Sequence, residues 1–434
     1  MRVHFTTLGC KVNQYETQIL SQLFSQSGFD VSDSPEGADI FVVNSCTVTA
    51  TGDKKTRQSL RRMKREHPGA LVALTGCFPQ AFPEEAAKIT EADVITGSYN
   101  RKGLLPAIQK ALITGERVIA ITPHAKGEAF EPMEAGAFLD RTRAFVKIED
   151  GCDRYCSYCI IPTARGPIRS KPLEELRREL VALAKRGYQE AVLVGINLSS
   201  YGRDLGLRLI DAVELACSVD GIRRVRLGSL EPELLTGEDI ERMSALPKFC
   251  PQFHLSLQSG CDATLQRMNR HYDRAEYRRI VDDLRAHFPG CAITTDVMVG
   301  FPGETEEEFA QSLQFVSDIA FAKAHVFAYS VRPGTRAASL PGQVSPTDKE
   351  ARSARMIAAA GATRRAFLDR QRGLIEEVLF ETGRDGVYEG YTKNYTPVRV
   401  KSPLPLQGAV RLTEIGDNDG DVCEGVLLEE RLTP

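Results

Sequence analysis

The sequence has no long apolar segment, and this absence excludes a membrane-spanning helix. No run of about 18 apolar residues occurs in the 434 residues. The first residues, MRVHFTTLGCKVNQYET, also lack the apolar core of a secretory signal peptide. We therefore expect a cytoplasmic protein that has no membrane partner.

A strong net charge is missing as well. The 55 Lys and Arg residues nearly balance the 58 Asp and Glu residues, and the formal net charge is −3. This balance argues against a globally basic nucleic-acid-binding protein, so any contact with RNA has to be local. A chain of this length is expected to form about three domains with cores of their own.

Eleven cysteines are present without a secretion signal. In a reducing compartment, thiols bind metals or do chemistry more often than they form disulfides. The settings of Cys217, Cys250, Cys291 and Cys423 favour a packing role, and Cys261 is ambiguous because it follows a loop-like segment. The other six lie in turns flanked by glycine or asparagine: Cys10, Cys46, Cys77, Cys152, Cys156 and Cys159.

Residues 1–122 alternate short β-rich runs with helical patterns. The runs VHFTTLGC, DIFVVNSC and ALVALTGC each end in a cysteine. Their spacing of about 30 residues is typical of βαβ units and predicts a parallel α/β domain. Because the carboxyl ends of parallel strands meet at one edge of a sheet, Cys10, Cys46 and Cys77 are expected to converge there.

Residues from about 123 to 140 contain proline and glycine and show no clear period, which predicts a linker. Alternating strand and helix patterns follow over residues 138–368 and predict a parallel barrel of partial (β/α)6 form, with its functional groups at the carboxyl ends of the strands. Short strand-like runs separated by turn residues in 371–434 predict a small all-β barrel. The six barrel runs are AFVKIED, EAVLVGI, RRVRLGS, FHLSLQS, AITTDVMVG and AHVFAYS.

Cys152, Cys156 and Cys159 lie in one loop, GCDRYCSYCIIPTARG, after the first of these barrel runs. No fourth cysteine or histidine is close to them in the sequence. A structural zinc site needs four protein ligands, whereas three thiolates can hold an iron–sulfur cubane and leave one iron open. The incomplete set therefore favours an iron–sulfur cluster over a zinc site completed by a distant residue.

The C-x3-C-x2-C spacing of this loop resembles the signature of the radical S-adenosylmethionine (SAM) enzymes. The resemblance implies a [4Fe-4S] cluster whose open iron binds SAM, and reductive cleavage of SAM to a 5′-deoxyadenosyl radical. It also implies that Tyr158 lies beside the adenine of SAM.

Small and polar residues at the other strand ends suit a SAM pocket, although each position alone is also typical of an ordinary loop. Gly300 and Gly303 are expected to allow close packing there. The predicted pocket-facing side chains are Asn197, Ser256, Gln258 and Asp296.

The order of the three domains is similar to that of the radical SAM methylthiotransferases, whose β tail is called a TRAM domain. In that family three N-terminal cysteines, here Cys10, Cys46 and Cys77, hold a second [4Fe-4S] cluster, which carries the sulfur to be inserted. No catalytic residue beyond the six cluster ligands is predicted.

Three segments, TLGCKVNQYETQ, NSCTVTATGDKKTRQ and EGYTKNYTPV, resemble the branch of this family that acts on N6-threonylcarbamoyladenosine (t6A) in tRNA. The branches that act on isopentenyladenosine and on a ribosomal protein more often read GCQMN and GCPKN at the first segment. Two departures are mild: NSC stands where NTC is commoner, and Lys171 stands where arginine is usual.

The resemblance implies conversion of t6A at position 37 of tRNA to its 2-methylthio form. Such a reaction needs SAM, two [4Fe-4S] clusters, an electron donor such as a flavodoxin or ferredoxin, and a sulfur source. The alternatives are a methylthiotransferase of one of the other two branches, a radical SAM enzyme of another reaction type, and a non-enzymatic iron–sulfur RNA-binding protein.

Contacts with tRNA are expected from the tail, where aromatic and amide side chains suit an unpaired nucleotide. These residues are Tyr388, Tyr391, Asn394 and Tyr395. The basic run DKKTRQSLRRMKREHPG after Cys46 either contacts phosphates or is a solvated helix face. Arg165 and Arg332 are candidates to pair with the carboxylate of the threonylcarbamoyl group.

Overall fold

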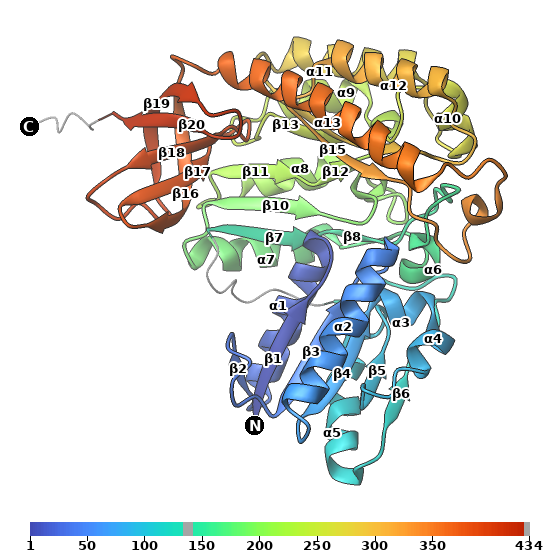
Figure 1. Cartoon of the computed structure of the whole chain (residues 1–434). Coiled ribbons are helices and arrows are strands. Elements are labelled where there is room, and N and C mark those ends of the chain that lie inside the picture. Colours follow the sequence, from blue (N-terminus) through green and yellow to red (C-terminus); the bar gives the residue numbers. More distant parts are fainter. Residues whose placement is uncertain (133–141, 429–434) are drawn as a thin grey trace, which may run out of the picture.

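The computed structural model describes residues 1–132 and 142–428, which form three units in chain order (Figure 1). An α/β unit at the N-terminus lies against one side of a parallel barrel, and a small β-barrel lies at one end of that barrel. The predicted domain boundary at residue 138 and part of the predicted linker lie outside the described residues, so the division into 1–122, 138–368 and 371–434 stays a prediction.

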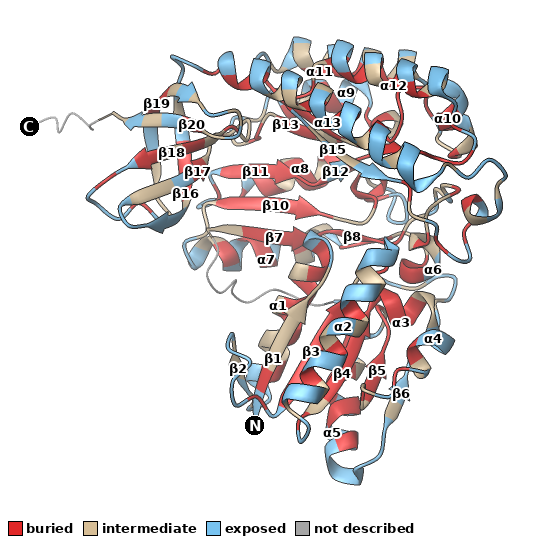
Figure 2. Cartoon of the chain, viewed as in Figure 1, coloured by how far each residue is buried: buried red, intermediate tan, exposed pale blue. Residues whose placement is uncertain are grey.

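The N-terminal unit is a parallel sheet in the order β2-β1-β3-β4-β5-β6, as predicted. Strands β3 and β4 are almost completely buried, as expected for a sheet that helices cover on both faces (Figure 2). The strands are β1 (Arg2–Thr7), β2 (Asp30–Ser32), β3 (Ile40–Ser45), β4 (Leu71–Gly76), β5 (Val94–Thr96) and β6 (Val118–Ala120), and the helices are α1 (Lys11–Gln26), α2 (Ala50–Glu66), α3 (Cys77–Ala81), α4 (Pro83–Ala87), η1 (Arg101–Gly103) and α5 (Leu104–Thr114).

The second unit is the predicted open parallel barrel. Its strand pairs β7-β10-β11 and β12-β13-β14-β15 are all parallel, and Gly228 alone separates β11 from β12. The strands are β7 (Arg143–Lys147), β8 (Glu149–Asp150), β9 (Arg169–Ser170), β10 (Glu190–Val194), β11 (Arg224–Leu227), β12 (Ser229–Leu230), β13 (Gln252–Leu255), β14 (Ala292–Val299) and β15 (Lys323–Ala328). The helices are α6 (Ile161–Arg165), α7 (Leu173–Lys185), η2 (Leu198–Ser200), α8 (Leu209–Ser218), η3 (Pro232–Leu234), α9 (Gly237–Ser244), α10 (Asp262–Arg267), α11 (Arg274–His287), α12 (Glu306–Ile319), η4 (Arg336–Ser339) and α13 (Pro346–Asp369).

The tail forms the predicted all-β module, a closed barrel in the order β16-β17-β18-β20-β19. Val378, Phe380, Val398 and Ile415 fill its interior. The turn between the second and third strands carries Tyr395, which adopts a left-handed φ of 69°. The strands are β16 (Ile375–Arg384), β17 (Val387–Tyr391), β18 (Pro397–Lys401), β19 (Val410–Asn418) and β20 (Cys423–Leu427).

No helix among the described residues is long and apolar enough to cross a membrane.

A buried ionic network joins the α/β unit to the barrel. Glu16 of α1 lies 2.6 Å from Arg101 and 3.0 Å from Lys147, and it accepts a 3.1 Å hydrogen bond from Nη2 of Arg165. Burial alone would raise the pKa of Glu16, but the three cations outweigh burial and lower it to about 2. The carboxylate therefore stays charged and holds cations from both units at one point.

A Glu16→Gln substitution is expected to destabilise the folded protein by about 3–5 kcal/mol at neutral pH, because it leaves buried cations without their counter-charge. The pKa of Glu16 is depressed from 4.5 to about 2. Its contribution is therefore fully present above pH 4.5 and is lost as the pH falls toward 2, and the variant should lack this part of the acid sensitivity. Thermal unfolding at several pH values measures both effects.

Glu116→Ala is the matched control, because Glu116 is exposed in the loop after α5. Equal unfolding temperatures for the two variants would contradict the structural role of Glu16.

Candidate active site

Three cysteines of the α/β unit converge at one edge of its sheet, as predicted. Cys10 lies between β1 and α1, Cys46 follows β3, and Cys77 opens α3 after β4. Strands β1, β3 and β4 are neighbours in the sheet. Burial raises the pKa values of Cys46 and Cys77, and the neighbouring cysteines of the set raise them further, which shows that the thiols lie close together. Gly9 allows the close approach, since a Cβ at Gly9 would lie 2.9 Å from the Cβ of Cys46.

Arg165 reaches this edge from the barrel unit. It is fully buried, and its Nε donates a 3.1 Å hydrogen bond to Sγ of Cys77. Burial raises the pKa of the Cys77 thiol to about 12, while Arg165 acts in the opposite direction. Arg165 is therefore a fixed donor to a candidate cluster ligand and cannot reach a substrate carboxylate, contrary to the role considered from the sequence.

The second cysteine set lies in the loop between β8 and α6. The Cys152 amide donates to the carbonyl of Gly166, and the Cys159 amide donates to the carbonyl of Cys156. The hydroxyl and amide of Ser157 bond to the carbonyls of Arg267 and Met268. The loop is thus anchored at Cys152 and at Ser157, and a turn joins Cys156 to Cys159.

Arg270 and Glu231 form the polar wall beside this loop. Arg270 donates a 3.2 Å hydrogen bond to Sγ of Cys156 and pairs with Glu231, which follows β12. Arg270 also bonds to the carbonyl of Ser256, as does the hydroxyl of Tyr272 at 2.6 Å. The sequence did not indicate Arg270, because it lies in a loop far along the chain from Cys156.

The two cysteine sets suit iron–sulfur clusters better than single metal ions. Among the described residues, no three His, Cys, Asp or Glu side chains converge on a point that could hold one metal ion. Cubane ligands need no such point, because each thiolate binds a different iron. Burial raises the pKa of Cys152 and Cys159, so the thiolate form of each depends on a cation such as iron. All eleven cysteines are free thiols, and the five outside these sets are buried.

Polar atoms without partners lie beside the second set. Asn197 Oδ1 and Glu149 Oε1 are buried and lack hydrogen-bond partners in the described part of the chain. Burial raises the pKa of Glu149 well above its ordinary value, and Glu149 in turn raises the pKa of Cys152. Orphaned polar atoms beside a thiol loop are the groups that a polar cofactor would engage.

Three of the residues predicted to face SAM share a cavity of about 180 Å³ with Cys159. They are Tyr158, Gln258 and Asp296. Tyr158 packs edge-on against Phe301, with 6.3 Å between the ring centroids. Ser256 and Asn197 do not line this cavity and lie instead near Arg270 and Glu149, as described above. Gly300 packs against α13, where a Cβ would lie 2.4 Å from Cγ of Lys349, and Gly303 bonds to the carbonyl of Gly342.

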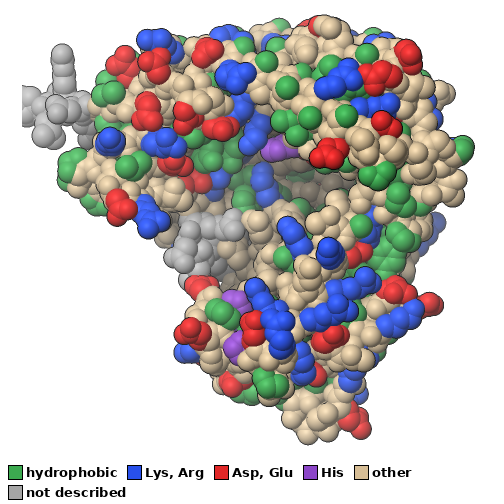
Figure 3. All heavy atoms as spheres, in the orientation of Figure 1, with side chains coloured by type: hydrophobic (Ala, Val, Ile, Leu, Met, Phe, Trp, Pro, Cys, Tyr) green, Lys and Arg blue, Asp and Glu red, His purple; other side chains and the backbone are tan. Residues whose placement is uncertain are grey.

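A larger cavity of about 900 Å³ is lined by residues of all three units. Cys10 and Lys11 come from the α/β unit, Asp296 and His254 from the barrel, and Tyr395 from the tail. Figure 3 shows this face of the molecule hollowed between the units, with basic side chains in the hollow. Because Asp296 also lines the smaller cavity, the two cavities border each other at this residue.

The predicted tRNA-binding tyrosines take different places. Tyr391 and Tyr395 line the large cavity and stack on each other with 4.3 Å between centroids, and Arg226 lies over Tyr395 at 4.7 Å. Tyr388 packs partly into the core of the tail barrel.

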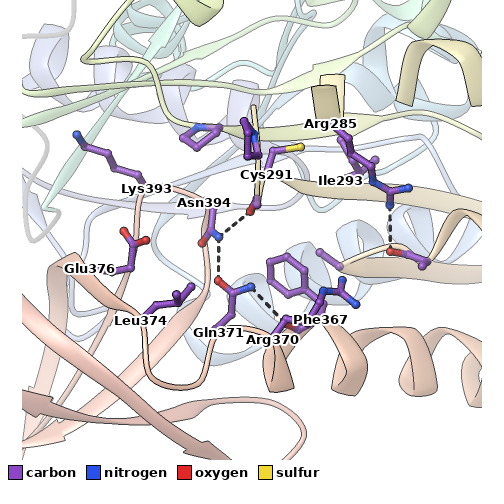
Figure 4. Close-up of a pocket in the computed structure, with 15 residues that line it drawn as sticks. Arg285, Cys291, Ile293, Phe367, Arg370, Gln371, Leu374, Glu376, Lys393 and Asn394 are labelled. Carbon is purple, nitrogen blue, oxygen red and sulfur yellow. Dashed lines mark hydrogen bonds between the residues drawn. The ribbon is translucent and has the colours of Figure 1, made fainter. Parts of the chain in front are cut away.

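The side chain of Asn394 forms its hydrogen bonds with other residues of the chain. Its amide donates to the carbonyl of Gly290 and to Gln371, and its oxygen accepts from Thr392 and Thr396 (Figure 4). It lines a separate cavity of about 760 Å³ between the barrel and the tail. Because its bonding capacity is used within the chain, we do not carry Asn394 into the proposed tRNA site.

The basic run forms α2, and its two sequence-based interpretations both apply in part. Leu60 and Met63 are buried, and Lys64 pairs with Asp93 at 2.8 Å. Lys54 and Lys55 are exposed and have no ion pair in the described part of the chain. Arg332, the other carboxylate candidate, is buried and pairs with Asp53 at 2.8 Å, so it joins α2 to the barrel and does not face a ligand cavity.

Comparison with known proteins matches residues 146–316 to the radical SAM superfamily and residues 2–97 to a family described as uncharacterized protein family UPF0004. The threonylcarbamoyladenosine tRNA methylthiotransferase MtaB of Bacillus subtilis is 37% identical over 94% of this chain and 92% of its own length. The chain belongs to the radical SAM methylthiotransferase family. SAM and [4Fe-4S] clusters are therefore cofactors of this methylthiotransferase.

Other relatives agree with this placement. The tRNA-2-methylthio-N(6)-dimethylallyladenosine synthase of Symbiobacterium thermophilum is 33% identical over all of the chain and 95% of its own length. Among solved structures, the radical SAM methyltransferase TsrM of Kitasatospora setae superposes with a TM-score of 0.56 at 13% identity, over 89% of this chain and 77% of TsrM. The likeness to TsrM shows the fold alone.

An Arg270→Gln substitution is expected to shift the midpoint potential of the cluster bound by Cys156 downward by roughly tens of millivolts, because a cationic hydrogen bond to a ligand sulfur favours the reduced state. The measurement is a redox titration followed by electron paramagnetic resonance. A background in which Cys10, Cys46 and Cys77 are alanine confines the signal to one cluster. Arg274→Gln is the control, since Arg274 pairs with Asp262 at the surface; an equal shift in both variants would contradict a specific effect of Arg270.

Proposed function

We propose that this methylthiotransferase converts t6A at position 37 of tRNA to 2-methylthio-t6A. The observation that carries the proposal is the large cavity with Cys10 of the first cysteine set on one wall and Asp296, which also borders the Cys159 cavity, on the other. A base held there lies between the two sets. The name of the Bacillus subtilis relative supports t6A as the substrate.

The six cysteines divide the chemistry between two sites. Cys152, Cys156 and Cys159 would hold the cluster that binds SAM, and Cys10, Cys46 and Cys77 would hold the second cluster. When bound, these groups supply a carbon-centred radical and the sulfur to be inserted. Arg270 and Arg165 each donate to one ligand sulfur, at 3.2 Å and 3.1 Å, and so stabilise the charge on each set.

The side chains of the barrel position the cofactor and exclude water. Tyr158 is packed against Phe301 and offers an apolar surface for a purine. Asp296 lies 3.4 Å from Nε2 of His254, so its carboxylate is oriented at the border of the two cavities. Gln258 lies in the smaller cavity beside Cys159 with its backbone fixed by two hydrogen bonds to β14.

The remaining partners follow from the reaction. An electron donor such as a flavodoxin or ferredoxin and a sulfur source are required, and the cytoplasm is where tRNA would meet the enzyme. The exposed lysines at the start of α2, next to Cys46, would contact phosphates of the anticodon arm.

Deletion of the gene is expected to remove 2-methylthio-t6A from the tRNA of the host and leave t6A, as measured by mass spectrometry of nucleosides. Complementation with Cys46→Ala should fail, although the purified, reconstituted variant should still cleave SAM when reduced without oxygen. Complementation with Cys217→Ala, a buried thiol outside both sets, should succeed. Persistence of 2-methylthio-t6A, or loss of 2-methylthio-isopentenyladenosine instead, would reject t6A as the substrate.

A Tyr395→Ala substitution is expected to weaken tRNA binding about tenfold at fixed salt, because stacking of a base on an aromatic ring contributes about 1–3 kcal/mol. Tyr395→Phe keeps the ring and should bind tRNA as the unmodified protein does. Filter binding or fluorescence anisotropy with full-length tRNA provides the affinities. An unchanged affinity in the alanine variant would remove Tyr395 from the tRNA site.

A further inference from the structure

The large cavity is lined by more cations than anions. Its basic side chains are Lys11, Lys323, Arg364, His254 and His325, and its acidic ones are Asp296 and Asp421. The two acidic groups already have partners. Arg364 bonds to Asp421 through its Nε at 3.3 Å, and Asp296 faces His254.

Two lysines are left without a counter-charge. Neither Lys11 nor Lys323 has a hydrogen bond or an ion pair within residues 1–132 and 142–428, and both side chains are exposed to the cavity. Lysine ammonium groups that line a cavity without a partner provide an anion-binding site.

The two lysines differ in what surrounds them. Lys323 lies near Arg364, and the carboxylate of Asp421 is close enough to stabilise the charged form of Lys323. Lys11 lies near Arg143 and Arg226, whose charges are already used by Glu381 at 2.7 Å and by Glu190 at 2.8 Å. Glu190 acts on Lys11 as well, but its carboxylate is paired with Arg226, so the ammonium of Lys11 has no ion pair of its own within the described residues.

Lys11 also has the better position for a group attached to the reacting base. It directly follows Cys10, a ligand of the sulfur-carrying set, and it shares the cavity with the tyrosine pair. A cation here suits a substrate with a carboxylate and does not suit the uncharged isopentenyl group.

We propose that Lys11 binds the carboxylate of the threonylcarbamoyl group and thereby selects t6A over unmodified adenosine. This inference rests on the proposed function. It replaces Arg165 and Arg332, whose guanidinium groups are buried in contacts between the units.

The test compares two anticodon stem-loop RNAs that differ only in carrying t6A or unmodified adenosine at position 37. Dissociation constants are measured at one salt concentration with the reconstituted holoenzyme. The wild-type protein should bind the t6A RNA more tightly than the RNA with unmodified adenosine. Lys11→Gln should lose about tenfold or more in affinity for the t6A RNA alone, as expected for one charge-assisted contact. Lys11→Arg should keep the preference.

Lys323→Gln is the matched control, because it removes the other unpaired lysine of the same cavity and should keep the preference for t6A. Iron content and the visible absorption of Lys11→Gln should equal those of the unmodified enzyme, which separates recognition from loss of the cluster next to Cys10. The inference is overturned if Lys11→Gln keeps the preference, if it loses affinity equally for both RNAs, or if only Lys323→Gln abolishes the preference.

Failure of the inference and failure of the proposed function give different results. If the unmodified enzyme produces no 2-methylthio-t6A, the proposed function fails. If it produces 2-methylthio-t6A and Lys11→Gln still prefers the t6A RNA, only the assignment of Lys11 fails.

Discussion

Arg165 ties the two cysteine sets together. It lies in the short helix after the Cys159 loop, yet it donates to Sγ of Cys77 and to the carboxylate of Glu16 in the other unit. A guanidinium that is fully buried is costly unless its donors are satisfied with good geometry. The contact therefore holds only for one placement of the barrel against the α/β unit, and in that placement Cys10 and Cys159 line two cavities that border each other at Asp296.

Glu190 has a similar role at the other interface. It bonds to Arg226 at 2.8 Å, and Arg226 and Arg224 donate in turn to carbonyl groups of the tail. The tail is thereby fixed through its backbone, which leaves the rings of Tyr391 and Tyr395 over the cavity. Removing one partner of the Arg165–Glu16 pair or of the Arg226–Glu190 pair would destabilise the fold by more than the intact pair stabilises it, because one buried charge would be left without a partner and without water. The two networks thus select a geometry and add little net stability.

The sequence was informative where a pattern has a local cause. The three cysteine-terminated runs indicated neighbouring parallel strands, and these strands bring Cys10, Cys46 and Cys77 to one edge. The alternation of strands and helices predicted the open barrel, and the spaced turns of the tail predicted its closed barrel. In the two α/β regions the deciding information lies within about 30 residues, which is the span of one βαβ unit, and in the tail it lies within neighbouring strands and their turns.

Contacts between distant segments could not be predicted in this way. Arg165 and Arg332 lie near strand ends, where ligands bind, but they point into the interfaces between the units. Arg270 reaches Cys156 only because the barrel brings their two loops together. Asn394 has a side chain of the kind that often contacts RNA, but its amide donates a hydrogen bond to the carbonyl of Gly290 within the chain. A charged or polar residue in a loop carries no local sign of which way its side chain will face.

The distribution of charge explains how a chain with a net charge of −3 can serve a polyanion. The tail contributes aromatic rings to the cavity, and the lysines there come from α1 and β15, in the other two units. Most other arginines at the interfaces are neutralised by buried carboxylates, so they do not attract phosphate. Lys11 and Lys323 at the cavity, and Lys54 and Lys55 at the start of α2, have no ion pair within the described residues. These lysines provide a local positive charge near the place where a base has to enter, which a chain with a nearly balanced net charge needs in order to bind RNA.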